Sequence, residues 1–439
     1  MLKRKVYDEL LRWKNNHRNS CLMIKGARQV GKTFIVREFG KNEYNSFIEI
    51  NFIKYKELKE IFDGSLSADE IYKRMTLYIR DIKLIPENTL IFMDEIQNCG
   101  NARTAIKSLV EDGRFDIITS GRFLGLTYTE NGDREAEEPA SLPTGYEDFI
   151  EMYPLDFEEY MWAAGYNDKV IKILKEYYDE KSKVPQFINE KFLNLFREYI
   201  VVGGMPEVVA DFTEYHDFNR VQALQERLLE NYRLDISKHA RGAEKKKVRN
   251  CYDSIPKQLS KGLKKFQYSI VEKGRTRKKY GGSIQWLKDS ALVNICYNIR
   301  EPYTPLMANS VEAQFKLYVN DTGLLCAMYG PETKKALLTN SIKGKTKGGI
   351  YENIISESLV KNGYNLYYYK PDDNHELEFL LEREGKIIPV EVKSGNTATV
   401  SLNNFIKEYN PTIAYKFISG NVGLSDTKVT LPYYMVMFV

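Results

Sequence analysis

The stretch from residue 26 to residue 33 constrains this chain more than any other. It reads GARQVGKT and consists of Gly26, Ala27, Arg28, Gln29, Val30, Gly31, Lys32 and Thr33. An apolar run precedes it and a helical pattern follows it, which is the setting in which GxxxxGK followed by Ser or Thr binds phosphate. We expect main-chain amides and a helix N-terminus to hold the phosphates, Lys32 to neutralise their charge and Thr33 to ligate Mg²⁺.

Short apolar runs alternate with longer helical patterns over residues 19–122. The runs are Cys21–Ile24, Ser46–Phe52, Leu90–Met93 and Phe115–Thr119. Apolar runs of this length read as buried strands, and their alternation with helices is typical of a parallel sheet with helices on its faces. The sequence therefore predicts an α/β fold for the first part of the chain.

Two carboxylates and a hydroxyl follow two of these predicted strands. Asp94 and Glu95 come directly after Leu90–Met93, and Ser120 follows Phe115–Thr119. Ligands of open α/β sheets bind at the carboxyl ends of the strands, so Asp94 is placed to hold Mg²⁺ and Glu95 to activate the attacking water. Ser120 is a candidate sensor of the terminal phosphate. The prediction is an enzyme that binds ATP with Mg²⁺ and hydrolyses it.

The charge of the chain is unevenly distributed. The formal net charge is only +4, but residues 238–279 contain fifteen lysines or arginines and three acids, a net of +12 that leaves −8 for the rest. Such a segment is typical of a surface that contacts a phosphate backbone, and it can also be a solvated face. We expect nucleic acid as a partner, DNA rather than RNA.

Composition excludes several classes of protein. Hydrophobic residues at 43% and charged residues at 28% are globular values, and no apolar run is long enough to span a bilayer. The five cysteines are scattered singly, and the N-terminus shows no export signal. We therefore expect a cytoplasmic protein without a membrane partner.

Three domains are predicted, over residues 1–165, 166–341 and 342–439. The middle domain is mostly helical and contains the basic segment, and Ile284–Val293 has the spacing of a helix that runs into a strand. This order suggests a winged-helix-like unit. The last domain is expected to contain a helix at Ile350–Asn362, then strands, a helix and strands.

A predicted hairpin in the last domain pairs two acids. If Glu384 and Gly385 form its turn, Glu378 faces Glu391, and Glu376 faces Lys393. Two carboxylates this close repel each other unless a cation or a proton lies between them, and oxygen ligands suit Mg²⁺. The alternative is an exposed hairpin that Glu376 and Lys393 stabilise slightly.

Seven motifs, taken together, resemble a known family. They read GARQVGKT, IFMDEIQ, IITSG, MYPLDFEEYMW, VVGGMPE, FKLYVNDTGLL and PVEVKSG. In this order they are similar to bacterial and archaeal AAA-type ATPases with a C-terminal DUF4143 region. The resemblance implies a P-loop NTPase fold of the ASCE/AAA type, Walker A roles for Lys32 and Thr33, Walker B roles for Asp94 and Glu95, and a sensor role for Ser120.

The family also implies a homo-oligomer whose active site receives an arginine from a neighbouring copy. Arg103, Arg114 and Arg122 are the candidates. Arg122 also departs from the family pattern, because a small polar residue is common after the Ser-Gly pair.

The C-terminal hairpin resembles the PD-(D/E)xK nuclease motif. Glu378 takes the position of the usual Asp, Glu391 and Lys393 form the ExK element, and Glu352 on the preceding helix is a candidate fourth group, with Mg²⁺ held by the three glutamates. This implies a restriction-endonuclease-like fold. Glu in place of Asp shifts the metal, so nuclease activity is left open.

Two hypotheses of function follow. In the first, ATP hydrolysis is coupled to nucleic-acid binding through the basic middle domain, with a nuclease-like C-terminal domain. In the second, the chain is a nucleotide-dependent switch that binds a protein partner, and its C-terminal module is catalytically inactive.

The motifs at Gly203–Pro206 and Asp321–Gly323 are interpreted as a turn and as a turn or helix cap.

Overall fold

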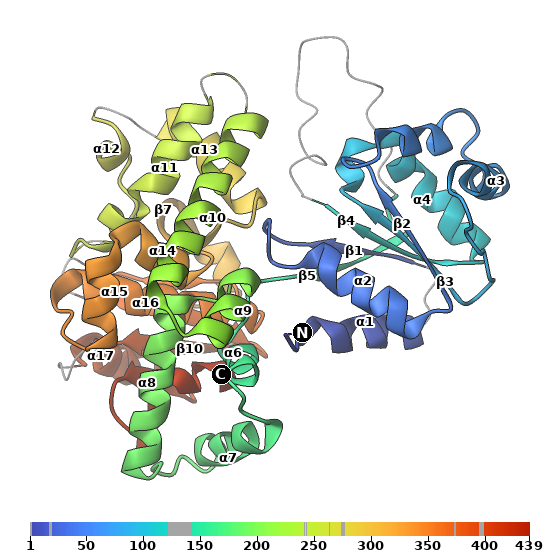
Figure 1. Ribbon diagram of the computed structural model, residues 1–439. Helices are drawn as coiled ribbons and strands as arrows, with labels where there is room; N and C mark the ends of the chain where they lie inside the picture. The colour runs from blue at the N-terminus through green and yellow to red at the C-terminus, as the bar shows by residue number, and fades with distance from the viewer. Residues whose placement is uncertain are drawn as a thin grey trace. The chain divides into compact units, whose positions relative to one another are not determined.

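The computed structural model of the chain describes two compact units (Figure 1). The described residues are 2–16, 20–121, 143–240, 242, 244–262, 264–273, 277–372, 375–394 and 399–439. Arg4–Tyr153 form the N-terminal unit, and Pro154–Val439 with the first residues of the chain form the C-terminal unit.

A parallel sheet forms the centre of the N-terminal unit. Its order is β2-β3-β4-β1-β5, with β1 at Cys21–Lys25, β2 at Ser46–Asn51, β3 at Thr89–Asp94, β4 at Asp116–Ser120 and β5 at Glu147–Glu151. The four predicted strands and the parallel arrangement are confirmed. The edge strand β5 was not predicted, because its sequence EDFIE has no apolar run and is only partly buried.

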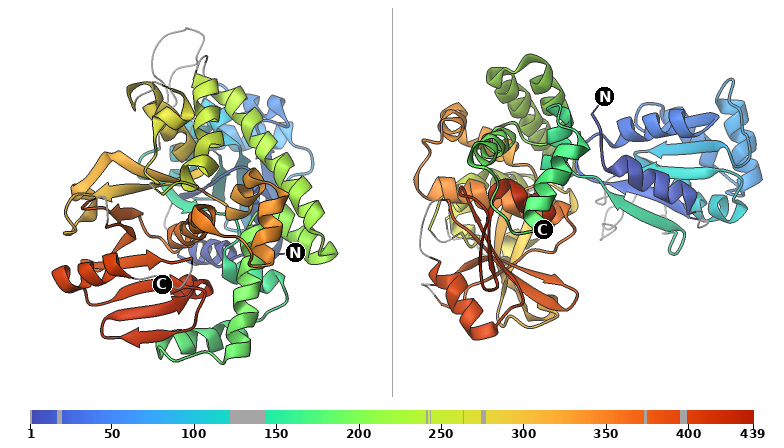
Figure 2. Two further views of the ribbon diagram at one scale, coloured as in Figure 1. Left: turned by 90° about the vertical axis from the view of Figure 1, so that its left-hand side faces the viewer. Right: turned by 90° about the horizontal axis from the view of Figure 1, so that it is seen from below.

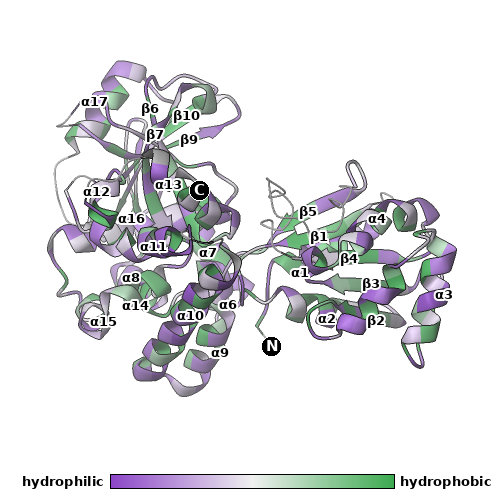
Figure 3. Ribbon diagram, turned by 90° about the horizontal axis from the view of Figure 1, so that it is seen from above, coloured by the Kyte–Doolittle hydropathy of each residue, from purple (hydrophilic) through white to green (hydrophobic). Residues whose placement is uncertain are grey.

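Helices cover both faces of this sheet. Alternate strand residues, among them Met23, Ile50 and Met93, form one core cluster with η1 (Lys56–Phe62), α3 (Ala68–Tyr78) and α4 (Gly100–Asp112). Since side chains alternate along a strand, their neighbours point to the opposite face, where α1 (Val6–Asn15) and α2 (Lys32–Glu43) pack. Figure 3 shows the apolar colour of the strands in this unit.

The C-terminal unit begins as an assembly of helices. They are α6 (Phe157–Ala163), α7 (Asp168–Asp179), α8 (Gln186–Val202), α9 (Pro206–Tyr215), α10 (Phe218–His239), α11 (Glu244–Leu259), α12 (Tyr268–Val271) and α13 (Arg277–Asp289). Two more, α14 (Thr322–Tyr329) and α15 (Pro331–Leu338), follow the first strands, and α16 (Gly344–Lys361) is buried from Gly349 to Leu359. No helix in the described part of the chain is long and apolar enough to cross a membrane.

A mixed sheet of eight strands completes this unit, and Figure 2 shows its orange and red strands. Its order is β12-β13-β11-β10-β9-β8-β6-β7. The strands are β6 (Val293–Ile299), β7 (Ser310–Val319), β8 (Tyr367–Tyr369), β9 (Leu377–Arg383), β10 (Lys386–Val392), β11 (Ala414–Ile418), β12 (Gly423–Ser425) and β13 (Lys428–Pro432), with α17 (Val400–Tyr409) after β10. This matches the predicted order of helix, strands, helix and strands after residue 342.

The sheet joins segments that the sequence prediction placed in separate domains. The hairpin β6–β7 lies before residue 341, yet β6 pairs in parallel with β8 after it. The hairpin that would be the wing of the predicted winged-helix-like unit therefore forms one edge of a larger sheet. The helix α6, which was placed in the first domain, belongs to the C-terminal unit, where Phe157 contacts Phe196 edge to face at 4.9 Å.

The predicted register of the C-terminal hairpin is confirmed. Phe379 pairs with Val390, and Arg383 with Lys386, across a turn at Glu384 and Gly385. Both turn residues have positive φ, 52° and 71°, as a two-residue hairpin turn that matches the strand twist requires.

Candidate nucleotide site and C-terminal charged cluster

The backbone of the loop between β1 and α2 depends on two glycines. Gly26 has a φ of 142°, and a Cβ there would collide with the carbonyl oxygen of Met152. Gly31 has a φ of 98° and immediately precedes α2. The Lys32 side chain folds over the loop, and its Nζ donates to the carbonyl oxygens of Gly26 at 2.8 Å and Ala27 at 2.7 Å. The ammonium group thus lies at the loop, where the sequence placed it.

Asp94 is the centre of a hydrogen-bond network at the carboxyl edge of the sheet. Its Oδ2 accepts from the Thr33 hydroxyl at 3.0 Å and from the Asn51 side-chain amide at 2.8 Å, and its Oδ1 accepts from the Ser120 hydroxyl. The structure brings Thr33, Asp94 and Ser120 together. Sequence reasoning missed Asn51, although its position at the end of β2 places it on this same edge.

The two neighbouring acids lie in different environments. Asp94 is 3% exposed, and burial raises its pKa, although the Ser120 and Thr33 hydroxyls oppose this effect. Glu95 is half-buried and has a left-handed backbone with a φ of 58°. That conformation directs the chain away from the strand after Asp94. The Glu95 Oε2 accepts from the Gln97 amide at 2.6 Å, which fixes its carboxylate beside the network.

A second group of charges surrounds Glu352 in the C-terminal unit. This glutamate on α16 forms an ion pair with Lys264, and its other oxygen lies 3.7 Å from the Lys316 ammonium and 3.3 Å from the Tyr318 hydroxyl. Lys316 is completely buried and also pairs with Glu376 at 2.5 Å. The lysines hold the pKa of Glu352 below its usual range despite burial. Sequence reasoning assigned neither lysine to this site.

The facing acids of the hairpin share one lysine. The Lys393 ammonium lies 3.2 Å from a Glu391 oxygen and 3.7 Å from a Glu378 oxygen, and the main-chain N–H of Val392 donates to Glu378 at 3.1 Å. Burial raises the pKa of Glu378 to about 7 and also raises that of Glu391.

Lysines accompany the three glutamates of the predicted metal site in this structure. Among the described residues, no group of three acidic, histidine or cysteine side chains is arranged to hold a metal ion. Glu352, the expected third ligand, is neutralised by Lys264 and Lys316 instead. These lysines supply positive charge that compensates the buried carboxylates. Lys264 and Lys316 lie far from Glu352 in the sequence, so the sequence pattern did not indicate this pairing.

Three family models match separate parts of the chain. Residues 18–161 match the AAA domain, residues 193–335 match a domain of unknown function named DUF8612, and residues 347–433 match another named DUF4143. The chain therefore combines an AAA domain with a DUF4143 region. The AAA domain contains the loop and the Asp94 network, and the DUF4143 region contains the hairpin and most of the charged cluster.

The chain also shows distant similarity to solved structures. The Walker-type ATPase PABY2304 of Pyrococcus abyssi is 12% identical, with 75% of this chain and 96% of that chain covered and a TM-score of 0.44. The replication initiator DnaA bound to AMPPCP and single-stranded DNA is 11% identical, with 66% and 90% covered and a TM-score of 0.29. At these scores the similarities are too weak to indicate a function for this chain. No curated protein matches the sequence.

The candidate arginines of the AAA domain have different surroundings. Arg103 is 3% exposed and forms a two-pronged ion pair with Glu147 at 2.7 and 2.8 Å, so it cannot reach a neighbouring copy in this conformation. Arg114 lies at the surface between Asp112 and Asp69. Arg122 lies outside the described residues.

Two other family motifs meet in a buried contact of the C-terminal unit. The Asp321 carboxylate accepts from the N–H groups of Gly204 at 2.6 Å and Leu324 at 2.9 Å, and the second bond caps α14. Gly203 has a φ of 76°, and a Cβ there would collide with Asp321. Burial raises the pKa of Asp321 to about 6. These motifs are therefore a turn and a helix cap, as predicted, and they hold α8, α9 and α14 together.

Proposed function

We propose that the AAA domain binds ATP with Mg²⁺ and hydrolyses the γ-phosphate bond. The observation that carries the proposal is the hydrogen-bond network of Thr33, Asp94 and Ser120 beside the glycine loop. The Thr33 hydroxyl and the Asp94 carboxylate are oxygen donors from two elements, a donor set that suits Mg²⁺. When bound, Mg²⁺ neutralises charge on the phosphates.

Each residue of the site has a separate role in this proposal. The amides of Gly26–Thr33 and the N-terminus of α2 bind the phosphates, and Lys32 exchanges its carbonyl partners for phosphate oxygens. Glu95 orients and deprotonates the attacking water, and Ser120 senses the γ-phosphate. Asn51 positions Asp94 through its side-chain amide.

Lys32→Ala tests nucleotide binding. We expect calorimetry to show ATP·Mg²⁺ binding to the full chain, and a loss of at least about tenfold in affinity in the variant, since a charged hydrogen bond contributes about 1.5–3 kcal/mol. Lys41→Ala, in the last turn of the same helix, removes an equal charge away from the loop and is the matched control. Equal affinity of wild type and Lys32→Ala for ATP·Mg²⁺ contradicts the proposed role of this loop in phosphate binding.

We further propose that the α11–α13 surface contacts nucleic acid. Lys246, Lys257, Lys273 and Lys279 are exposed there, and none forms an ion pair with a described acid. Lys246 and Lys257 lie on α11, Lys279 lies on α13, which packs against α11, and Lys273 lies in the segment between α12 and α13. By contrast, Lys264 from the same basic segment is mostly buried against Glu352 and cannot contribute while that ion pair is intact. Exposed lysines without acid partners are the groups that release counterions from DNA.

The salt dependence of DNA affinity tests the proposed nucleic-acid contact of the α11–α13 surface. We expect the wild-type chain to bind duplex DNA with an affinity that falls as salt rises, and Lys246→Gln combined with Lys257→Gln to reduce the logarithmic salt slope by about two. Fluorescence anisotropy at several salt concentrations measures it. The double change Lys335→Gln and Lys407→Gln, on exposed positions of α15 and α17, is the matched control. Identical slopes in wild type and the α11 variant contradict the proposed surface.

The alternative is a nucleotide-dependent switch with a protein partner and an inactive C-terminal module. The pairing of Glu352 with Lys264 and Lys316 favours this view of the DUF4143 region, because a metal ion at Glu352 must displace a lysine. Mg²⁺-dependent nicking of DNA that is lost in Glu391→Ala supports nuclease activity, and absence of nicking beside intact ATP turnover supports the switch.

A further inference from the structure

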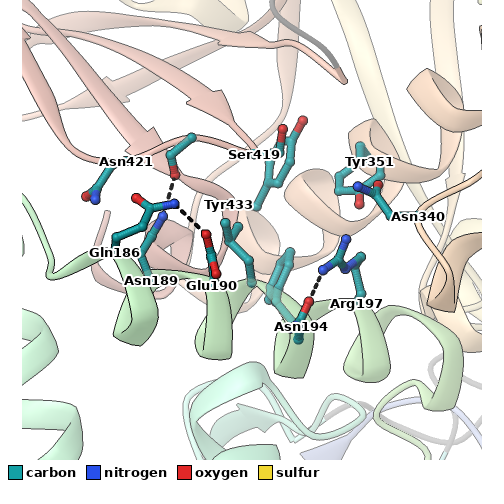
Figure 4. Close-up of a pocket in the computed structure, with 13 residues that line it drawn as sticks. Gln186, Asn189, Glu190, Asn194, Arg197, Asn340, Tyr351, Ser419, Asn421 and Tyr433 are labelled. Atoms are coloured by element: carbon teal, nitrogen blue, oxygen red, sulfur yellow. Dashed lines mark hydrogen bonds between the residues drawn. The ribbon is translucent and has the colours of Figure 1, made fainter.

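A cavity of about 390 Å³ lies in the C-terminal unit, between α8 and the loop after β11. Figure 4 shows its wall, with side chains from α8 facing Ser419, Asn421, Tyr351 and Tyr433. This volume is in the range of small-molecule sites. None of the roles proposed above uses it.

Hydrogen bonds fix the walls of this cavity. The Asn189 amide donates to the Gly420 carbonyl at 3.1 Å, and its oxygen accepts from the Tyr434 hydroxyl at 2.9 Å. Asn421 accepts from the Val184 N–H at 3.0 Å and donates to the Val184 carbonyl at 2.7 Å. These two side chains have their partners, so they shape the cavity and leave ligand contacts to other groups.

Arg197, at one end of the cavity, has no carboxylate partner among the described residues. Arg197 donates to Asn194, but its Nε is buried and has no hydrogen-bond partner. Lys347 does not line the cavity, but its ammonium donates to the Asn340 oxygen at 3.4 Å, and its pKa is lowered by burial and by the charge of Arg197. Neither cation pairs with a carboxylate among the described residues. A buried donor without an acceptor is costly, so this end of the cavity favours an oxyanion.

An acid lies at the other end, two turns earlier on the same helix. Glu190 accepts from Gln186 at 2.6 Å and has no cationic partner in the described part of the chain. The apolar side chains of Leu193 and Phe196 line the cavity between the two charges. Seven helical residues from Glu190 to Arg197 rise about 10 Å, which is the reach of about three extended residues. A ligand with many negative charges, such as a nucleotide, is disfavoured by Glu190.

We propose that this cavity binds a small zwitterion of the amino-acid or short-peptide class. Its carboxylate pairs with the Arg197 guanidinium, its ammonium group pairs with Glu190, and its peptide groups face Asn194. The two charged ends of the cavity, with their separation, set both the polarity and the length of the ligand.

Triglycine is the probe, and its blocked forms are the test on the wild-type chain. Calorimetry is expected to show binding of triglycine, and a loss of about tenfold or more in affinity when its carboxylate is amidated or its amine is acetylated. Inorganic phosphate is titrated in parallel. Equal affinity of triglycine and its amide, absence of triglycine binding, or binding of phosphate alone each overturns the proposal.

Variants assign the two ends of the ligand. Arg197→Gln is expected to remove the preference for the free carboxylate, and Arg197→Lys to restore part of it, since a lysine keeps the charge without the planar fork. Glu190→Gln is expected to lower the affinity for triglycine but not the affinity for its acetylated form. Lys191→Gln, on the same helix outside the cavity, is expected to change nothing. If Glu190→Gln lowers the affinity for acetylated triglycine as much as that for triglycine, Glu190 does not bind the ammonium group. Should a variant fail to fold, the series of blocked ligands on the wild type decides alone.

Discussion

Replacing Glu95 with glutamine is expected to lower ATP turnover by about 10²–10⁴-fold while ATP binding persists. A positioned general base contributes an acceleration of this size, and glutamine cannot accept the proton of water. Glutamine has the same shape, and its amide oxygen can still accept the hydrogen bond from Gln97. The binding groups Lys32, Thr33 and Asp94 are untouched. Turnover is measured by phosphate release at saturating ATP, and binding by calorimetry.

Glu87→Gln is the matched control for this substitution. Glu87 lies in the same unit, is exposed and also has a left-handed backbone, with a φ of 61°. The same change of charge, at a residue with the same backbone conformation but away from the site, is expected to leave ATP turnover unaltered. A Glu95→Gln protein that hydrolyses ATP at the wild-type rate removes Glu95 from the role of base. One that no longer binds ATP shows that the residue acts in binding instead.

Replacing Arg103 with methionine is expected to lower the free energy of unfolding of the AAA domain by about 3–5 kcal/mol. The side chains of Arg103 and Glu147 are 4% and 5% exposed, and breaking a buried ion pair strands the remaining charge. Burial already raises the pKa of Glu147, and Arg103 opposes that rise. Without Arg103, protonation relieves the stranded carboxylate, so the loss of stability is expected to shrink as the pH falls. Denaturant unfolding at several pH values measures it.

The double variant Arg103→Met with Glu147→Met separates the two partners. We expect it to recover most of the lost stability, since two apolar side chains leave no uncompensated charge. Lys175→Met, which breaks an exposed pair with Asp179, is the control and is expected to cost about 0.3–0.5 kcal/mol. If Arg103→Met keeps its stability but loses ATP turnover, the arginine acts in catalysis and not in the core.

Local patterns in the sequence were sufficient for the elements near the nucleotide site. The apolar runs before Asp94 and Ser120 predicted β3 and β4, and parallel pairing brought the two residues together because the strands end on one edge. The hairpin register followed from a two-residue turn at Glu384. In each case, the information lay within a few residues of the feature.

Features that depend on distant partners could not be predicted in this way. Strand β5 is an edge strand whose charged residues include Glu147, and its identity depends on pairing with β1. The pairing of Glu352 with Lys264 and Lys316 was not predicted, because these lysines lie 88 and 36 positions away in the sequence and periodicity says nothing about such pairs. The shared sheet of the predicted middle and last domains was missed for the same reason, since the pairing of β6 with β8 crosses a linker that resembled a boundary.

That pairing decides how the protein can be dissected. A fragment that ends before residue 342 keeps β6 and β7 but loses β8, the neighbour whose backbone groups complete the inner side of β6. The exposed row of amides and carbonyls is then open to strands of other molecules, which is a known route to aggregation. We therefore expect the helical segment and the DUF4143 region to fold correctly only when they are expressed together.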